Sequence, residues 1–153
     1  MKLLINETWG GFGVSVYTMI HTASKKGIKV VPYFGKMDFV SGTVVYRPID
    51  DVKEFDKKMS TGDIVLLADC NLQEFVAPLG DDDRLKKFSP WWFSPDDNRT
   101  DSDLISAVEE DGDLAFTPVN KPTVVEIPDG YDYEINDYDG METVYAGKDL
   151  RVI

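Results

Sequence analysis

Near its N-terminus the chain reads Lys2-Leu-Leu-Ile-Asn-Glu-Thr-Trp-Gly-Gly-Phe-Gly-Val-Ser15. This stretch predicts a short buried strand over residues 3–5, a glycine-rich loop, and Ser15 as the cap of a helix. Glycines permit backbone conformations that other residues avoid, and the first N–H groups of a helix have no partner within it. Such a loop can present N–H groups to an anion, so it is the first candidate for a ligand site.

A helix is predicted to follow the loop because apolar residues recur there at helical spacing. Its apolar face comprises Val16, Met19, Ile20 and Ala23. Gly27 fits the position just beyond the end of the helix, and residues 28–34 have the composition of a strand. A strand, a helix and a strand with short connections favour a βαβ unit, in which the two strands are parallel.

Short segments of similar kinds fill the rest of the chain. Further strands are predicted over residues 42–47, 63–68 and 123–127, and a hairpin over 131–135 and 141–146 joined through Tyr138-Asp-Gly140. Short helices are predicted after Asp50 or Asp51, after Asn71, and from Thr100-Asp-Ser-Asp103 to Gly112. We therefore expect a single domain over residues 1–153 of the α/β or α+β class. It would have a mixed β-sheet, several short helices, an N-terminal βαβ-like unit and an antiparallel C-terminal hairpin.

Residues 80–98 are the least regular part, and they include Phe88-Ser-Pro-Trp-Trp-Phe-Ser-Pro95. Aromatic side chains dominate burial in proteins, so these rings can fill the edge of the core. The alternative is that they form a surface on which a partner or a nucleobase stacks. The second possibility leads us to expect a homo-oligomer.

Composition limits the class of protein. The chain is 42% hydrophobic and 12% aromatic, which fits a folded domain. Its apolar runs fall short of the ~20 residues that span a membrane, and the first residues turn polar too soon for a secretory signal. Cys70 and His21 are the only residues of their types, which excludes an internal disulfide and argues against a zinc site. We therefore expect a cytoplasmic protein without a metal or cofactor.

The net charge of −12 lies entirely in the second half of the chain. Residues 1–76 carry 9 acidic and 9 basic side chains, whereas residues 77–153 carry 19 and 7. This disfavours nucleic acid as a direct partner, because phosphates are neutralised by clusters of Lys and Arg. The acidic side chains either keep a surface soluble or engage a basic partner by imitating nucleic acid.

The sequence favours binding over catalysis. The glycine loop lacks the Gly-Lys-Ser/Thr of a phosphate-binding Walker loop and does not match the dinucleotide fingerprint. His21 lies within a predicted helix, and Cys70 has only that histidine as a partner base. The aspartates at 129, 132, 137 and 139 lack calcium-loop spacing. No combination of nucleophile, base and orienting group is visible, so no catalytic or metal-binding residue is assigned.

Arg99 is the candidate residue for holding an anion. It is the only basic residue between Lys87 and Lys121, and it precedes a predicted helix in Asp96-Asp-Asn-Arg-Thr-Asp101. A guanidinium near helix-end N–H groups can hold a phosphate or carboxylate through two hydrogen bonds. The alternative is that Arg99 only balances the neighbouring aspartates.

Several short motifs occur in order along the chain. They are Ile5-Asn6 with Gly10-Gly-Phe-Gly-Val-Ser15, Arg99-Thr-Asp-Ser-Asp-Leu-Ile-Ser-Ala-Val-Glu-Glu110, Val125-Glu-Ile-Pro-Asp129, Glu134-Ile135 and Tyr138-Asp-Gly-Met-Glu142. Together they resemble a family of small bacteriophage-encoded proteins, over residues 1–27 and 98–146, while the middle of the chain departs from it. The resemblance implies an accessory protein that acts in the bacterial host cytoplasm, and small phage proteins of this kind often counter host defence.

We therefore expect a protein that binds and sequesters a phosphorylated or nucleotide-like immune signal without turnover. The expected ligand-binding residues are Asn6, Trp9, Gly10, Gly11, Phe12, Gly13, Arg99 and Asp101. In this hypothesis loop N–H groups and Arg99 hold the anion, Asn6 bonds a polar edge, and an aromatic ring stacks on a base. One alternative is an acidic protein that blocks a basic host defence protein, and another is an enzyme that degrades the signal.

Overall fold

The computed structural model describes residues 1–147 and places their strands in three separate antiparallel sheets. In the first sheet β1 (Lys2–Asn6) pairs with β6 (Pro122–Glu126). The second has the order β4–β2–β3–β5 and comprises β2 (Val31–Asp38), β3 (Thr43–Pro48), β4 (Ile64–Ala68) and β5 (Phe75–Pro78). The third is the hairpin of β7 (Asp132–Tyr138) and β8 (Met141–Gly147).

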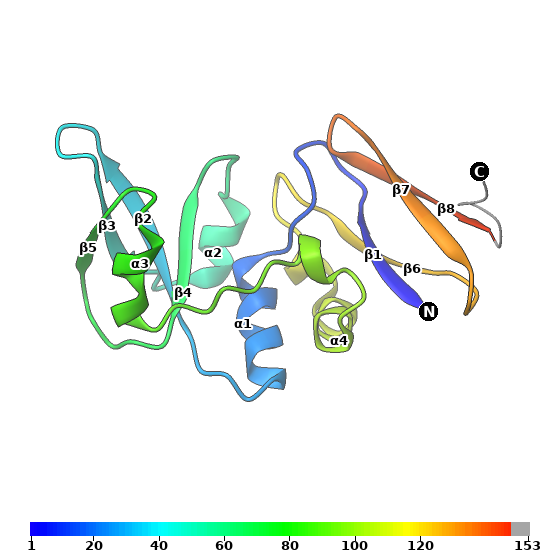
Figure 1. The fold of residues 1–153 in the computed structure, drawn as a ribbon, viewed down its shortest axis with the longest axis horizontal. Coiled ribbons are helices and arrows are strands. Elements are labelled where there is room, and N and C mark those ends of the chain that lie inside the picture. The colour runs from blue at the N-terminus through cyan, green and yellow to red at the C-terminus, as the bar shows by residue number, and fades with distance from the viewer. Residues whose placement is uncertain (148–153) are drawn as a thin grey trace.

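Short helices connect these strands. They are α1 (Val16–Lys25), α2 (Val52–Lys57), α3 (Asp82–Leu85) and α4 (Ser102–Asp111), with 3-10 turns η1 (Lys86–Phe88), η2 (Asp96–Asn98) and η3 (Gly112–Ala115). Figure 1 shows the four-stranded sheet at one end of the molecule, the β7–β8 hairpin at the other, and α1 and α4 between them. The predicted α+β class, the antiparallel C-terminal hairpin and the helices after Ser15, Asp51 and Thr100 are therefore confirmed.

The predicted βαβ unit is wrong. β1 and β2 belong to different sheets, and α1 carries the chain from one to the other. β2 begins at Val31 rather than at residue 28, and β3 and β4 take its two edges in antiparallel fashion. Pairing with β3 needs only a short turn, whereas a parallel partner needs a long crossover. The described strands pair only in antiparallel fashion, so the expected mixed sheet is also wrong.

The helix expected after Asn71 is replaced by the strand β5. Phe75 and Ala77 are buried, whereas Val76 between them is half exposed, which is the two-residue alternation of a strand. Ala77 pairs in register with Val44 of β3. Pairing with the edge strand β3 therefore determines that this segment is a strand. Apolar spacing along the sequence suited a helix, but pairing with a neighbouring strand overrides it.

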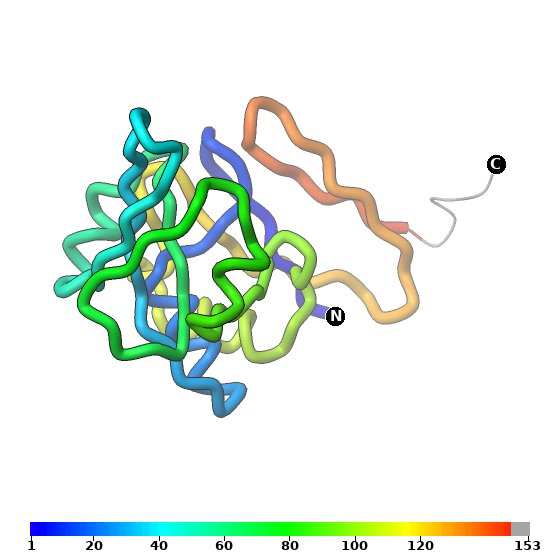
Figure 2. Tube along the Cα trace, turned by 60° about the vertical axis from the view of Figure 1, so that its left-hand side comes forward, coloured from blue at the N-terminus to red at the C-terminus, as the bar shows by residue number. Residues whose placement is uncertain are grey.

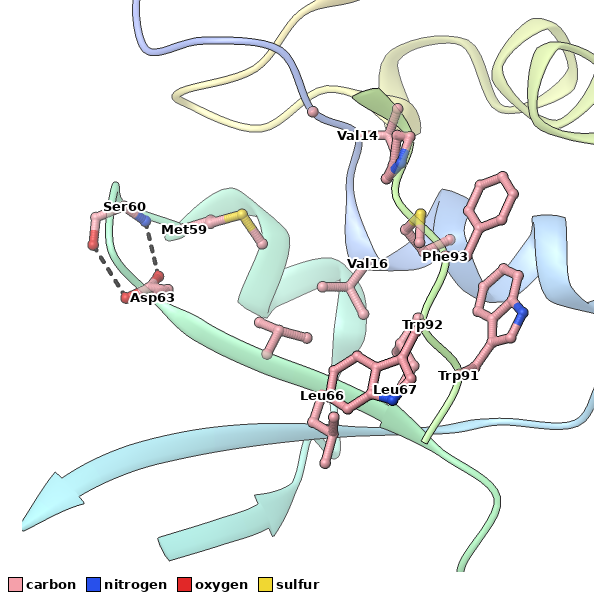
Figure 3. A pocket seen from close by; sticks show the side chains of 14 residues that line it. Val14, Val16, Met59, Ser60, Asp63, Leu66, Leu67, Trp91, Trp92 and Phe93 are labelled. Carbon is pink, nitrogen blue, oxygen red and sulfur yellow. Dashed lines mark hydrogen bonds between the residues drawn. The ribbon is translucent and has the colours of Figure 1, made fainter. Parts of the chain in front are cut away.

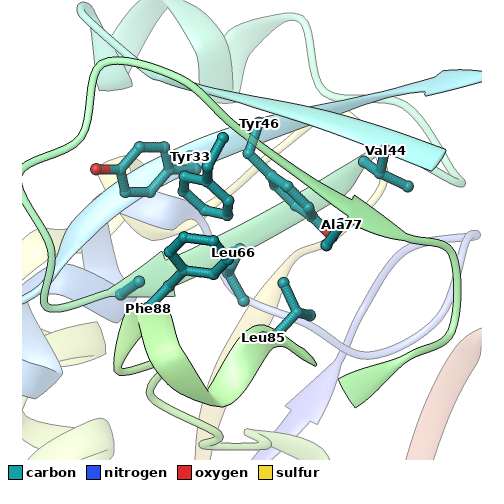
Figure 4. Packing of buried hydrophobic residues seen from close by; sticks show 9 residues of the cluster. Tyr33, Val44, Tyr46, Leu66, Ala77, Leu85 and Phe88 are labelled. Carbon is teal, nitrogen blue, oxygen red and sulfur yellow. The ribbon is translucent and has the colours of Figure 1, made fainter. Parts of the chain in front are cut away.

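Buried side chains form two clusters. Under the four-stranded sheet Tyr33, Tyr46 and Phe88 pack around Phe75, with ring centroids 4.1–4.9 Å apart. Figure 4 shows Tyr33, Tyr46 and Phe88 beside Leu66 of β4. The second cluster lies around α4, where apolar side chains of α4 meet those of β1 and the segment before α1. Its buried members are Leu4, Val14, Leu104, Ile105, Val108 and Ala115.

The N-terminus of α1 receives side chains from two directions. Ser15 is the N-cap, as predicted, and its hydroxyl accepts a hydrogen bond from Thr18 N–H. The buried carboxylate of Asp56, from α2, accepts from Val16 N–H at 2.8 Å and Tyr17 N–H at 3.0 Å. Burial raises the pKa of Asp56 although both N–H groups act to lower it. The first N–H groups of α1 are thus bonded to a carboxylate of the chain itself.

Candidate functional site

Arg99 lies beside β1, and all five N–H groups of its guanidinium are donated within the chain. Nη1 and Nη2 bond the two carboxylate oxygens of Glu142 at 2.7 and 2.8 Å. Nε and Nη2 bond Asp96 Oδ1 at 3.1 and 2.7 Å, and Nη1 also bonds the carbonyl of Leu4 at 3.2 Å. The ring of Phe12 covers the guanidinium, with its centroid 4.0 Å from Cζ.

Glu142 occupies the place at which the sequence predicts a bound anion. Its side chain is 5% exposed, and its Oε1 also accepts a hydrogen bond from the backbone N–H of Asn6 at 2.7 Å. Burial acts to lower the pKa of Arg99, but the carboxylates of Glu142 and Asp96 outweigh burial and raise it. The guanidinium therefore stays charged and holds β8 against β1.

Sequence reasoning missed Glu142 because it belongs to a long run of acidic residues. The signal that could have found it is its place in the hairpin. Glu142 lies two residues before Val144, which pairs with Ile135, so the carboxylate shares a face with partly buried apolar side chains. A carboxylate on such a face needs a buried cationic partner, and Arg99 is that partner.

The glycine loop packs against the turn of the β7–β8 hairpin. Gly10 and Gly11 adopt φ values of 113° and 94°, which favour glycine. Their backbone nitrogens lie so close to Gly140 that a side chain there would collide with them. The side-chain amide of Asn120 donates to the carbonyl of Gly11 at 2.9 Å. The loop is therefore shaped by contacts with the hairpin turn.

Asn6 and Trp9 also contact the hairpin. The buried side chain of Asn6 donates to the carbonyl of Gly140 at 2.6 Å and accepts from Lys121 N–H at 2.9 Å. Trp9 meets Tyr138 edge to face, with ring centroids 5.9 Å apart. Both predicted site residues thus help to attach the hairpin to the body of the protein.

Asp101 and Gly13 make different contacts from these residues. Asp101 is the N-cap of α4, where it accepts from Leu104 N–H at 2.9 Å, and it pairs with Lys26 of α1 at 2.8 Å. Gly13 is close to Asn120 and borders a separate pocket. The structure therefore brings six of the predicted residues together, and the side chains of Asn6 and Arg99 are hydrogen-bonded within the chain. The six are Asn6, Trp9, Gly10, Gly11, Phe12 and Arg99.

A pocket of about 360 Å³ lies between α1, β4 and residues 91–95. Figure 3 shows Trp91, Trp92 and Phe93 at one end and Ser60 and Asp63 at the other. Apolar side chains of α1, of the residue two before it, of β4 and of the segment after α2 make up most of the remaining wall. They are Val14, Val16, Met19, Met59, Val65, Leu66 and Leu67. We call this the aromatic pocket.

The aromatic segment is held at the edge of β4. Trp91 N–H donates to the carbonyl of Leu67 at 2.8 Å, and the rings of Trp91 and Phe93 stack with centroids 4.9 Å apart. Phe88 is buried in the core, whereas Trp92 is 59% exposed. The core-filling role is therefore confirmed for Phe88, while the later rings line an open pocket and the stacking of a partner on them stays a prediction.

Only one charged side chain lies among the described residues that line the aromatic pocket. This is Asp63, whose carboxylate accepts from the backbone N–H of Ser60 at 2.9 Å and from its hydroxyl at 3.3 Å. Such a lining suits a flat or apolar group with a hydrogen-bond donor at one end, and it offers no cation to a phosphate.

His21 connects α1 to the end of α4 and has both ring nitrogens near carboxylates. Its Nδ1 lies 2.8 Å from Asp111 Oδ1, and its Nε2 lies 3.3 Å from Glu110 Oε2. Asp111 also accepts a hydrogen bond from the hydroxyl of Thr18 at 2.8 Å. Within residues 1–147 no group of three or more His, Cys, Asp or Glu side chains is placed to hold a metal ion.

Comparison with protein families, with curated proteins and with solved structures gives no match to this chain. The resemblance to bacteriophage proteins therefore stays a prediction. In the described part of the chain, each helix is too short or too polar to cross a bilayer.

Proposed function

We propose that this protein binds and sequesters a small nucleotide-like ligand without turnover, and that it recognises the ring of that ligand. The aromatic pocket carries the proposal, because Trp91, Trp92 and Phe93 line one end of a space of about 360 Å³. That volume lies within the range of small-molecule sites, and aromatic walls suit a flat ring such as a nucleobase.

This proposal moves recognition away from the residues that the sequence favours. Arg99 donates all of its N–H groups to carboxylates and a carbonyl of the chain, so an anion there has to displace the buried Glu142. The aromatic pocket is open and mostly apolar. We therefore assign ring recognition to the pocket and structural support of the hairpin to Arg99.

The ring-binding role fits the setting that the bacteriophage resemblance implies. A phage accessory protein in the bacterial cytoplasm can counter host defence by removing a nucleotide immune signal from solution. Sequestration needs affinity and abundance rather than a catalytic group. The proposed ligand class is thus a nucleotide-like molecule whose base is buried and whose charged part stays in solvent.

Tryptophan fluorescence offers a direct test, because two of the three tryptophans line the pocket. Trp9→Phe removes the third, so the remaining signal reports on Trp91 and Trp92. Titration with linear and cyclic nucleotides should quench or shift this emission for one ligand. Trp92→Ala should weaken its binding by about 5- to 150-fold, since base–aromatic stacking contributes about 1–3 kcal/mol. The Trp9→Phe parent serves as the matched control.

Native mass spectrometry then identifies what is bound. Recovery of the intact ligand after heat release supports sequestration. Recovery of a chemically altered ligand would instead support the alternative that the protein is an enzyme that degrades the signal. If no nucleotide changes the fluorescence or the mass, the proposed function is wrong. The pocket would then have to serve a different class of partner.

The β7–β8 hairpin favours a second candidate function, an acidic blocker of a basic host defence protein. Glu134, Asp137 and Asp139 are exposed on a hairpin that stands at one end of the molecule. Binding of this kind should weaken steeply with salt. Replacing Asp132, Asp137 and Asp139 by Asn should reduce it, whereas Trp92→Ala should not. Binding that is insensitive to both salt and these replacements would exclude this candidate.

A further inference from the structure

The β7–β8 hairpin leaves one strand edge without a partner. Among residues 1–147, β7 pairs with β8 alone, and Figures 1 and 2 show the hairpin projecting from the rest of the molecule. β8 and the turn before it are the parts held to the body, because Asn6 of β1 bonds the carboxylate of Glu142 and the carbonyl of Gly140. The other edge of β7 stays open, and we call it the β7 edge.

The turn of the hairpin determines which backbone groups lie along the β7 edge. Asp139 and Gly140 both adopt positive φ, as in the two-residue turns that join antiparallel strands. The pair beside such a turn, Tyr138 and Met141, exchanges both backbone hydrogen bonds, and every second residue of β7 before it bonds β8 in the same way. The residues between these turn their N–H and C=O groups to the β7 edge. They are Tyr133, Ile135 and Asp137.

A row of unpaired backbone groups is a template for another strand. In the part of the chain that the structure describes, no hydrogen bond reaches the outward backbone groups of these three residues. Proteins commonly protect such an edge with Lys, Pro or a bulge. β7 contains neither Lys nor Pro, and it pairs with β8 residue for residue over its whole length. Its charged side chains are all acidic, so they oppose acidic strands and favour basic ones.

Charge therefore selects the partner. Residues 122–147 contain seven acidic side chains and no Lys or Arg. Ion pairs within residues 1–147 involve Asp129 and Glu142 of this segment, but not the carboxylates of Asp132, Glu134 or Asp137. A second copy of β7 would place acidic side chains opposite one another, which destabilises strand pairing, whereas basic side chains would pair with them.

The two faces of β7 define a pattern for the partner. Asp132 and Glu134 share a face with Tyr138, which is 78% exposed, whereas Tyr133 and Ile135 lie half-buried on the other face. An added strand extends the same two faces. Lys or Arg suits the first face, because carboxylates and a tyrosine ring both attract a cation. Apolar β-branched residues suit the second face.

We propose that the β7 edge binds an extended segment of a basic protein in which Lys or Arg alternates with apolar residues. The segment adds to the hairpin as an antiparallel third strand. Backbone hydrogen bonds along the edge supply affinity, and the carboxylates select the basic side chains. The inference deepens the second candidate function, the acidic blocker, and rests on it. It does not depend on the aromatic pocket.

The probe is a synthetic peptide of about eight residues in which Lys and Val alternate, long enough to span β7. Amide hydrogen exchange, followed by NMR, reports on the strand pairing. The N–H groups of Tyr133, Ile135 and Asp137 should exchange about tenfold or more slowly in the complex. Those of Glu134 and Asn136 should change less, because they already bond β8. Binding without protection of the first three would overturn the inference.

N-methylation of alternate peptide residues is the matched control, because it removes N–H groups and keeps the charge. Methylation of the residues that face β7 should weaken binding by about tenfold or more, since hydrogen bonds are lost. Methylation of the other set should leave binding nearly unchanged. Equal effects of both sets would overturn strand addition.

A charge reversal locates the contact on the protein. Glu134→Lys should weaken peptide binding by about 2- to 30-fold, because an opposite-charge pair becomes a like-charge pair. Asp69→Lys makes the same change at an exposed residue after β4, in the four-stranded sheet at the other end of the molecule. At about 0.15 M salt it should have less than a twofold effect, because distant charges are screened. Equal losses with both variants would contradict binding at the β7 edge.

A folded basic protein, such as cytochrome c, separates the inference from the acidic blocker. It offers positive charge without a free extended segment. Salt-sensitive binding of this protein, with no binding of the peptide, would overturn strand addition and support the acidic blocker. If neither binds, both the inference and the acidic blocker are wrong.

Discussion

Arg99 and Glu142 hold opposite charges in surroundings that exclude most water, with side chains 13% and 5% exposed. Loss of either group leaves the other charge buried without its partner. We therefore expect Arg99→Ala to lower the free energy of unfolding by about 3–5 kcal/mol, measured by urea unfolding with circular dichroism. The sequence-based hypothesis expects a different result, in which ligand binding weakens and stability hardly changes.

A double variant is the control for this interpretation. Arg99→Met combined with Glu142→Leu removes both charges, so it should be clearly more stable than either single replacement. If Arg99→Ala is as stable as the parent and loses binding of an anionic ligand, the anion site predicted from the sequence is correct and the structural role is not.

Asp101 gives stability that depends on pH. Burial alone would raise its pKa, but the ammonium of Lys26 and the N–H of Leu104 outweigh burial and hold the pKa below its usual value. The folded state therefore binds this proton less readily than the unfolded state. The stabilisation is present above the unfolded pKa, near pH 4, and is lost as the pH falls through the folded pKa.

The measurement is the free energy of unfolding from pH 7 down to about pH 2, a range that spans the usual pKa of Asp near 4. Asp101→Asn should fall less steeply over the acid part of this range than the parent. Asp97→Asn, which alters an exposed carboxylate just before Asp101, should keep the slope of the parent. Parallel curves for the parent and Asp101→Asn would contradict the assignment.

For single residues, the sequence predicts the features that depend only on neighbouring residues in the chain. Ser15 caps α1 and Gly27 follows its end with a φ of 72°, because both depend only on neighbouring residues. The partner of Arg99 is 43 residues away in the chain, and nothing near either residue marks the pair. The convergence of Asn6, Phe12 and Arg99 is real, but the group that completes it is Glu142.

Two neighbouring residues of β5 allow a test of whether this segment is a strand. Ala77 is 2% exposed and Val76 is 50% exposed, since the strand turns them to opposite faces. Val76→Lys should change the free energy of unfolding by less than about 0.5 kcal/mol. Ala77→Lys should cost more than about 3 kcal/mol, because it forces a charge into the core. Thermal and urea unfolding measure both, and equal effects would contradict the strand.

Most helices and strands are predictable because the residues that determine them lie within them. The pairing of the strands is not predictable in this way, because it depends on residues far apart in the chain. The β7–β8 hairpin follows from Tyr138-Asp-Gly140, where Asp139 and Gly140 both adopt positive φ. The partner of β1 does not follow, since β6 lies more than a hundred residues further along the chain. The βαβ prediction is wrong because it took β1 as the partner of β2 from their order in the chain. β2 pairs instead with β3, which follows it after a short turn.

The charge of the whole molecule predicts a response to salt. A net charge of −12 repels itself in the folded state more than in the extended chain. We expect the free energy of unfolding in urea to rise as sodium chloride goes from about 0.01 to 0.15 M, where the Debye length falls from about 30 to 8 Å.

Replacement of Asp132, Asp137 and Asp139 by Asn serves as the control and should reduce this rise. A loss of stability with salt would mean that ion pairs such as Lys26–Asp101 outweigh the general repulsion. The experiment thus compares the overall charge with individual pairs in one measurement.

The aromatic pocket is a property of the whole molecule. The composition of residues 88–95 predicts a cluster of aromatic side chains. The pocket wall, however, also includes residues of α1, of β4 and of the segment after α2. These parts are far apart in the sequence and meet only after the sheets are formed. The sequence therefore predicts that aromatic side chains gather here, but it does not predict the pocket that they line.

The pairing of β1 with β6 has a consequence for synthesis on the ribosome. The strands of the four-stranded sheet lie between residues 31 and 78, so that sheet can form while later residues are still being translated. Leu3, Leu4 and Ile5 leave the exit tunnel long before the strand that pairs with them, which begins at Pro122. Until β6 emerges, the nascent chain therefore carries an unpaired apolar strand to which a chaperone near the tunnel can bind.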